Sequence, residues 1–294
     1  MINTNATDRT TAQVVRSGDK LLPSLGILLV TGGLVLLGWF AYLWFKLPPA
    51  PYEYQLITEG DSKRFTQMDL DGWPELKLGQ YKVQADGVDK PIAEFIVARQ
   101  NEGPPVLIYW KNSTNEILYN FDRKPSELSA LAAAISKHAP KDALILSWWD
   151  TSRQIKLLTG HDTLFTNHLN EPLMIPITWL EQSKAIQAYE NQFWGSEINP
   201  QEREQFEHFS QALAAPAEEG VKQLRELIGS NREAYVIVHV TDLYRLGIMY
   251  PDKMGVAYQN FPMTGNMHGM INQMKVQLKE SGFDTYTLQS LSDN

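Results

Sequence analysis

The longest run of apolar positions extends from Leu21 to Phe45 and contains no charged residue. A helix rises about 1.5 Å per residue, so this run is long enough to cross the roughly 30 Å hydrocarbon layer of a membrane. A cleaved signal peptide and a buried hairpin helix are the alternatives, but the apolar core of a signal peptide is typically about 7–15 residues long and ends in small residues. Here the run ends in Trp44 and Phe45. We therefore predict a transmembrane anchor over residues 21–46, in contact with the lipid bilayer.

Short apolar runs separated by turn residues follow this anchor. A stiff, proline-rich spacer, Leu47–Tyr52, leads into them. Short runs bounded by Gly, Asn, Asp and Pro are typical of strands joined by tight turns. The pattern predicts a β-rich subdomain over residues 47–123, built as an antiparallel meander. Its expected strands are Tyr54–Thr58, Gln80–Gln84, Ile92–Arg99, Val106–Lys111 and Glu116–Phe121.

From Lys124 onward the apolar positions follow the helical period, and short apolar strands alternate with the helices. Alternation of strands and helices indicates an α/β layer with a mostly parallel sheet, here over residues 124–294. The chain as a whole is then α+β. Helices are expected from Pro125 to before Pro140 and over Trp179–Phe193, Pro200–Leu213, Glu218–Ile228 and Asn266–Lys279, with strands at Tyr235–Val240 and Phe283–Leu291.

The densest set of signals lies between Ala143 and Asn167. Ala143–Leu146 is an apolar run suited to a buried strand, a short helix follows, Gly160 suits its left-handed end, and Asp162–Phe165 can begin the next strand. In an open parallel sheet, the carboxyl end of a strand and the amino end of the next helix face the binding crevice. That position is occupied by Trp148, Trp149, Asp150 and Thr151.

The candidate binding residues at this edge each have a structural alternative. Asp150 could accept a hydrogen bond from a ligand or act only as a helix N-cap. One tryptophan ring is expected in the core and the other along the crevice, which suits a peptide or glycan ligand. Asp242 and Arg245 follow the strand Tyr235–Val240, so they could reach the same crevice or form a surface ion pair one helical turn apart.

Two further groups suggest metal ligands. His161, Asp162 and His168 could hold a metal, although exposed loop histidines are the simpler interpretation. Thioethers bind soft ions such as Cu(I), and a copper site could be built from Met263, Met267, His268 and Met270, with Met254 and Met274 nearby. Packing of this methionine stripe in a core is the alternative.

Charge and composition restrict the partners and the compartment. The net charge is −8, which argues against nucleic acid as a partner and favours cationic surfaces. Basic residues near the apolar run lie mostly before it, at Arg9, Arg16 and Lys20, so residues 1–20 are expected to be a cytoplasmic tail and the rest of the chain periplasmic, at the inner membrane. The chain has no cysteine, hence no disulfide and no motif for covalent haem.

No sequence motif indicates a catalytic mechanism. The chain has no recognisable Ser-His-Asp order, phosphate-binding loop or close pair of catalytic carboxylates. We expect no cofactor and consider a binding or accessory role more plausible than an enzymatic one. The sequence leaves open whether the chain forms a homo-oligomer.

The run Ser147–Asp150, with Ile155, Gly160 and Asp162–Asn167, resembles the Trp-Trp-Asp segment of the catalytic subunit of oligosaccharyltransferases. In that family the segment helps to hold the acceptor peptide in an exported α/β domain. Glu218–Val240 resembles the helix and strand that follow there. Transferase activity is not implied, because its chemistry belongs to a domain with many membrane spans, and Thr151-Ser152 replace the usual Tyr-Gly pair.

The single apolar span, the cysteine-free exported region and the run Ala143–Arg153 also resemble the hydroxylamine oxidation protein B (HaoB) family of ammonia-oxidising bacteria. This resemblance implies a membrane-anchored accessory partner of a multihaem cytochrome, hydroxylamine dehydrogenase, in nitrification. A peptide- or glycan-binding module at the Trp-Trp-Asp edge and a periplasmic copper-handling protein are the alternative functions.

Overall fold

A computed structural model describes residues 21–45, 48–113, 125–169, 177–195, 199–229, 232–255 and 267–282. The chain divides into two compact units, residues 1–49 and 50–294. In the first unit, helix α1 covers Leu21–Phe45. Its segment Pro23–Phe45 is the one described helix that is long and apolar enough to cross a membrane, and a signal sequence would meet the same criterion.

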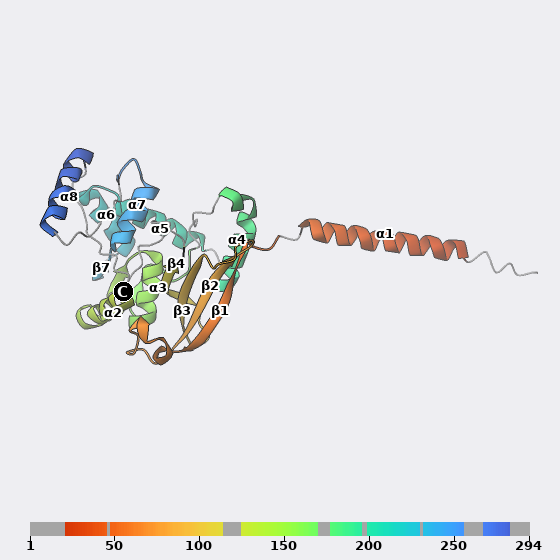
Figure 1. The fold of residues 1–294 in the computed structure, drawn as a ribbon, viewed down its shortest axis with the longest axis horizontal. Coiled ribbons are helices and arrows are strands. Elements are labelled where there is room, and N and C mark those ends of the chain that lie inside the picture. Colours follow the sequence, from red (N-terminus) through yellow and green to blue (C-terminus); the bar gives the residue numbers. More distant parts are fainter. Residues whose placement is uncertain are drawn as a thin grey trace, which may run out of the picture. The chain divides into compact units, whose positions relative to one another are not determined.

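The second unit begins with an antiparallel sheet in the order β1-β2-β3-β4, which confirms the predicted meander (Figure 1). The strands are β1 (Tyr52–Asp61), β2 (Leu76–Ala85), β3 (Ala93–Gln100) and β4 (Val106–Asn112), with the 3-10 helix η1 (Ser62–Met68) between the first two. Register shifts between Leu56 and Thr58 and between Ile96 and Val97 interrupt the pairing. The predicted fifth strand, Glu116–Phe121, lies outside the described residues.

Alternating side chains cover both faces of this sheet, because successive residues of a strand point to opposite sides. Leu76 and Leu78 pack on one face with residues of helices α2 (Pro125–His138) and α3 (Trp149–Thr159). Val83 and Ala85 pack on the other face with helix α4 (Ser183–Trp194), which follows the 3-10 helix η3 (Ile177–Gln182). The sheet is thus buried on both sides.

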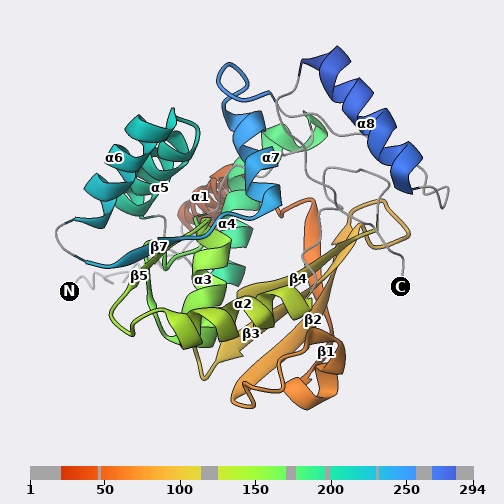
Figure 2. The same ribbon diagram turned by 90° about the vertical axis from the view of Figure 1, so that its left-hand side faces the viewer.

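A second sheet has three parallel strands in the order β6-β5-β7, which confirms the predicted parallel layer. Its strands are β5 (Leu144–Leu146), β6 (Asp162–Thr163) and β7 (Ala234–Val236). Leu144 and Leu146 pack with Phe206 of α5 (Pro200–Leu213), while Ile145 packs with Ile135 and Ile155 of α2 and α3. The remaining helices are α6 (Ala217–Ile228), which packs along α5, α7 (Val240–Met249) and α8 (Met267–Ser281) (Figure 2).

Of the two strands predicted in the C-terminal part of the chain, one is shorter than expected and the other lies outside the described residues. The strand predicted over Tyr235–Val240 ends at Val236, and α7 begins at Val240. Although this segment is apolar, it is not fully buried. Strand β7 lies at the edge of the sheet, and Val236 and Val238 are exposed. The predicted last strand, Phe283–Leu291, lies outside the described residues. The predicted boundary between a β-rich subdomain ending at residue 123 and an α/β subdomain beginning at residue 124 stays a prediction.

Candidate functional site

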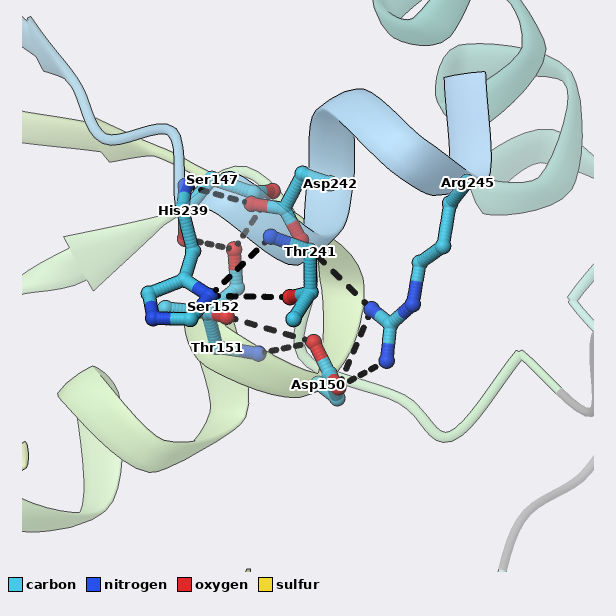
Figure 3. A network of polar contacts seen from close by, with 8 residues as sticks. All are labelled: Ser147, Asp150, Thr151, Ser152, His239, Thr241, Asp242 and Arg245. Carbon is cyan, nitrogen blue, oxygen red and sulfur yellow. Dashed lines mark hydrogen bonds and ion pairs between the residues drawn. The ribbon is translucent and has the colours of Figure 1, made fainter. Parts of the chain in front are cut away.

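Two helix N-termini meet where β5 and β7 end (Figure 3). The chain leaves β5 through Ser147 and Trp148 and enters α3, and it leaves β7 through His239 and enters α7. Because parallel strands end at the same edge of their sheet, the Trp-Trp-Asp segment and the Asp242–Arg245 segment lie side by side, which is one of the two arrangements that the sequence left open. This carboxyl edge is the candidate site.

The two tryptophans differ in burial, as expected. Trp148 is 1% exposed and makes an edge contact with Phe206 at 4.9 Å between ring centroids. Trp149 is half-buried and lies against His168 at 4.5 Å. The indole Nε1 of Trp149 is buried and has no hydrogen-bond partner among the described residues. Trp149 is therefore the indole with an unused donor at this edge.

Asp150 is not the N-cap of α3. Trp148 occupies the cap position without a side-chain bond, since the helix begins at Trp149, and Asp150 lies in the first turn. Its Oδ1 accepts from the amide of Thr151 at 2.6 Å and from the Thr151 hydroxyl at 3.2 Å. Its Oδ2 accepts from both terminal nitrogens of Arg245 at 3.3 Å. Asp150 thus joins α3 to α7.

Asp242 is buried rather than part of a surface pair. Its Oδ2 accepts from the His239 amide at 2.8 Å and completes a capping box, while its Oδ1 lies 3.5 Å from the guanidinium of Arg245. The same guanidinium lies over the Trp148 ring, 5.3 Å from its centroid. Arg245 therefore contacts two carboxylates and one indole, and its own side chain is 40% exposed.

Four polar residues that the sequence analysis missed complete the network: Ser147, Ser152, His239 and Thr241 (Figure 3). The hydroxyls of Ser147 and Ser152 lie 2.8 Å apart. Nδ1 of His239 accepts from the Thr241 amide at 3.3 Å and lies 2.9 Å from the Thr241 hydroxyl. Their position next to strand ends was the available signal, because Ser, Thr and capping side chains bond locally to free helix amides.

The chemistry of this edge is that of a closed polar network. Ser147, Ser152 and Thr241 are buried and hydrogen-bonded to neighbouring residues, as Asp242 is. The ordinary requirement for covalent catalysis is a nucleophile that a substrate can reach. The edge instead joins two helices through charge-assisted bonds, and Arg245, whose side chain is 40% exposed, is its most accessible charged group.

Helix α3 also connects the two sheets through buried polar side chains. Arg153 donates to the carbonyl of Pro105 at 2.8 Å, and Gln154 donates to that of Leu107 at 2.7 Å. Burial lowers the pKa of Arg153 to about 10, although the nearby carboxylates of Asp150 and Glu202 favour its charge. The candidate edge is thereby fixed to β4.

The proposed metal ligands do not form a carboxylate–histidine cluster. Within the described ranges, no group of three His, Cys, Asp or Glu side chains could hold a metal ion. His161 is buried, not exposed as expected, and His168 stacks on Trp194 at 4.7 Å. Met263 and the side chain of Met267 lie outside the description, whereas His268 is exposed and Met270 half-buried. The copper site stays a prediction.

Comparison with known proteins gives one match. A family model described as HaoA-associated protein HaoB matches residues 18–294. No curated protein and no solved structure matches this chain. The resemblance of the Trp-Trp-Asp segment to oligosaccharyltransferases therefore has no support from the comparisons. The matched range includes both sheets and every residue of the candidate edge.

Proposed function

Since this chain belongs to the HaoB family, we propose that it is a membrane-anchored, periplasmic accessory protein that associates with hydroxylamine dehydrogenase, HaoA, during nitrification. The family match over residues 18–294 is the observation that carries this proposal. The closed network at the candidate edge supports an accessory role, because its buried hydroxyls and carboxylates already bond to one another.

The anchor of this proposed complex is α1. Pro23–Phe45 has the length and apolarity of a span, and Trp39, Tyr42 and Trp44 suit the membrane interface at its carboxyl end. The basic residues before the run favour a cytoplasmic amino terminus. A chain held in this way would keep a soluble multihaem partner at the membrane surface.

Two measurements test the parts of this proposal separately. The tagged full chain is isolated in mild detergent at low salt from cells that also make hydroxylamine dehydrogenase, and haem in the eluate is measured. Recovery of the multihaem enzyme is expected, and its absence contradicts the association. The intact mass of the chain from washed membranes tests the anchor: a product that lacks residues 21–45 would identify a cleaved signal sequence.

A second candidate function is peptide or glycan binding at the candidate edge. It is favoured by Trp149, which combines a half-buried ring with a buried, unbonded Nε1 beside Asp150. Of the six residues predicted to contact the ligand, Trp149, Asp150 and Arg245 are within its reach, whereas Trp148, Thr151 and Asp242 are buried and would support them from below. Trp149→Phe keeps an aromatic ring and removes the donor, so it should weaken binding to a peptide or glycan array without unfolding. Unchanged binding by this variant would exclude Trp149 as the donor.

A further inference from the structure

A carboxylate without a basic partner lies between α4 and the antiparallel sheet. Glu190 is 3% exposed and accepts hydrogen bonds from the hydroxyls of Tyr52 and Tyr54, the latter at 2.6 Å, and from Nε1 of Trp194 at 2.6 Å. Among the described residues, no Lys or Arg pairs with it. A buried carboxylate is costly unless it is paired with a cation or well hydrogen-bonded, and here three neutral donors take the place of a cation.

The two phenols are held in their protonated form. Burial, followed by the charge of Glu190, raises the pKa of Tyr52 and of Tyr54 well above the ordinary value. A phenol that gives up an electron becomes a much stronger acid and needs a base within hydrogen-bond reach, about 2.6–3.2 Å. Glu190 is such a base for Tyr54, and its Oε1 accepts from both hydroxyls.

Aromatic rings connect this pair to less buried parts of the unit. The ring centroids of Tyr52 and Tyr54 lie 5.6 Å apart, and that of half-buried Trp179 lies 5.5 Å from Tyr52. On the other side, Trp194 lies 6.4 Å from Tyr54 and stacks on His168. Indole and phenol rings are the side chains most easily oxidised by one electron, and these are in direct contact.

We propose that Tyr52 and Tyr54, with Glu190 as proton acceptor, form a one-electron donor site that reduces one-electron oxidants. In the step, the oxidant takes one electron through half-buried Trp179 and leaves in its one-electron-reduced form. The O–H bond of a tyrosine breaks, its proton moves to Glu190, and a neutral tyrosyl radical remains. This inference does not depend on the partner under the proposed function, because the electron donors and the proton acceptor all belong to this chain.

The test uses the full chain in detergent, oxidised by photogenerated ruthenium(III) tris-bipyridine, with the radical followed by electron paramagnetic resonance. The wild type should give a tyrosyl radical whose yield does not change with buffer concentration, because the base is internal. Tyr52→Phe/Tyr54→Phe should reduce that yield at least tenfold. Glu190→Gln should make the remaining yield depend on buffer base.

Tyr235 provides the matched control, because its hydroxyl donates to Glu233 at 2.6 Å in an exposed pair. Tyr235→Phe should leave the buffer-independent radical unchanged. The inference is overturned if Tyr235→Phe removes the signal, or if the double variant keeps it. If circular dichroism shows that Glu190→Gln does not fold, the buffer dependence of the wild-type radical yield is the deciding measurement. A wild-type yield that rises with the concentration of buffer base also overturns the inference.

Discussion

At the scale of single residues, Arg245 is the side chain that the candidate edge depends on most. Its guanidinium joins Asp150 of α3 to Asp242 of α7 and covers Trp148. The two carboxylates belong to segments far apart in the sequence. Because the Arg245 cation lies within about 4 Å of both, it compensates their mutual repulsion. Removal of this one side chain should therefore weaken two helix starts at once.

Arg245→Met keeps most of the apolar stem and removes the charge. We expect the free energy of unfolding to fall by about 1–3 kcal/mol, because two acceptors in a partly buried network lose their donor. Urea denaturation followed by circular dichroism measures the change. Arg225→Met is the control: Arg225 is exposed on α6, so its change should stay within about 0.5 kcal/mol. Equal effects of the two variants would contradict the proposed role of Arg245.

His161 leads to a prediction of the opposite sign. The residue is 5% exposed, and neither ring nitrogen has a hydrogen-bond partner among the described residues. A buried polar group without a partner costs about 1–3 kcal/mol, so His161→Leu should leave stability unchanged or raise it by about 1 kcal/mol. Thermal unfolding provides the measurement, with exposed His208→Leu as the neutral reference. A clear loss of stability would show that the ring is hydrogen-bonded in solution.

At the scale of elements, the C-terminus of α3 depends on Gly160. Its φ of 72° lies in the left-handed region, and its amide donates to the carbonyl of Lys156. An alanine at this φ is strained by about 1–2 kcal/mol. Gly160→Ala should therefore lower the free energy of unfolding by that amount, as measured by urea denaturation. Gly72→Ala, in an open turn where an added Cβ meets nothing, should have little effect.

The same segment shows what could be predicted from the sequence. An apolar run followed by helical spacing and a glycine placed β5, α3 and β6 correctly, because these signals are local. Local signals also gave α5 its observed bounds, Pro200–Leu213, since Asn199 caps it and Pro200 occupies its first position. The four strands of the meander were found for the same reason.

Long-range partners could not be predicted in this way. Nothing near Glu190 in the sequence indicates that Tyr52 and Tyr54 bond to it, because the contact exists only once α4 packs on the sheet. Likewise, the sequence did not decide between a surface pair and a shared crevice for Asp242 and Arg245. In the structure Asp242 is buried, and Arg245 contacts Asp150 and Trp148 from a distant segment. Burial of polar groups is thus decided by packing between elements.

At the scale of the whole molecule, stability should fall at alkaline pH. The pKa values of Tyr52 and Tyr54 are raised in the folded state, so above about pH 10 the unfolded chain loses these protons while the folded chain keeps them. The resulting stabilisation is fully present below pH 10 and is lost as pH rises. Urea denaturation between about pH 8 and 11 should show this fall, and Tyr52→Phe/Tyr54→Phe should flatten it. An equal slope in both proteins would contradict the assignment.

The two sheets differ in strand length, and this difference predicts which sheet opens first in local unfolding. Strands of the antiparallel sheet have 7–10 residues, whereas β5, β6 and β7 have 3, 2 and 3. Few backbone bonds hold the parallel sheet, so its amide hydrogens should exchange with deuterated solvent sooner than those of β2 and β3. The carboxyl edge would then belong to the region that opens first, where a partner could bind a locally unfolded form.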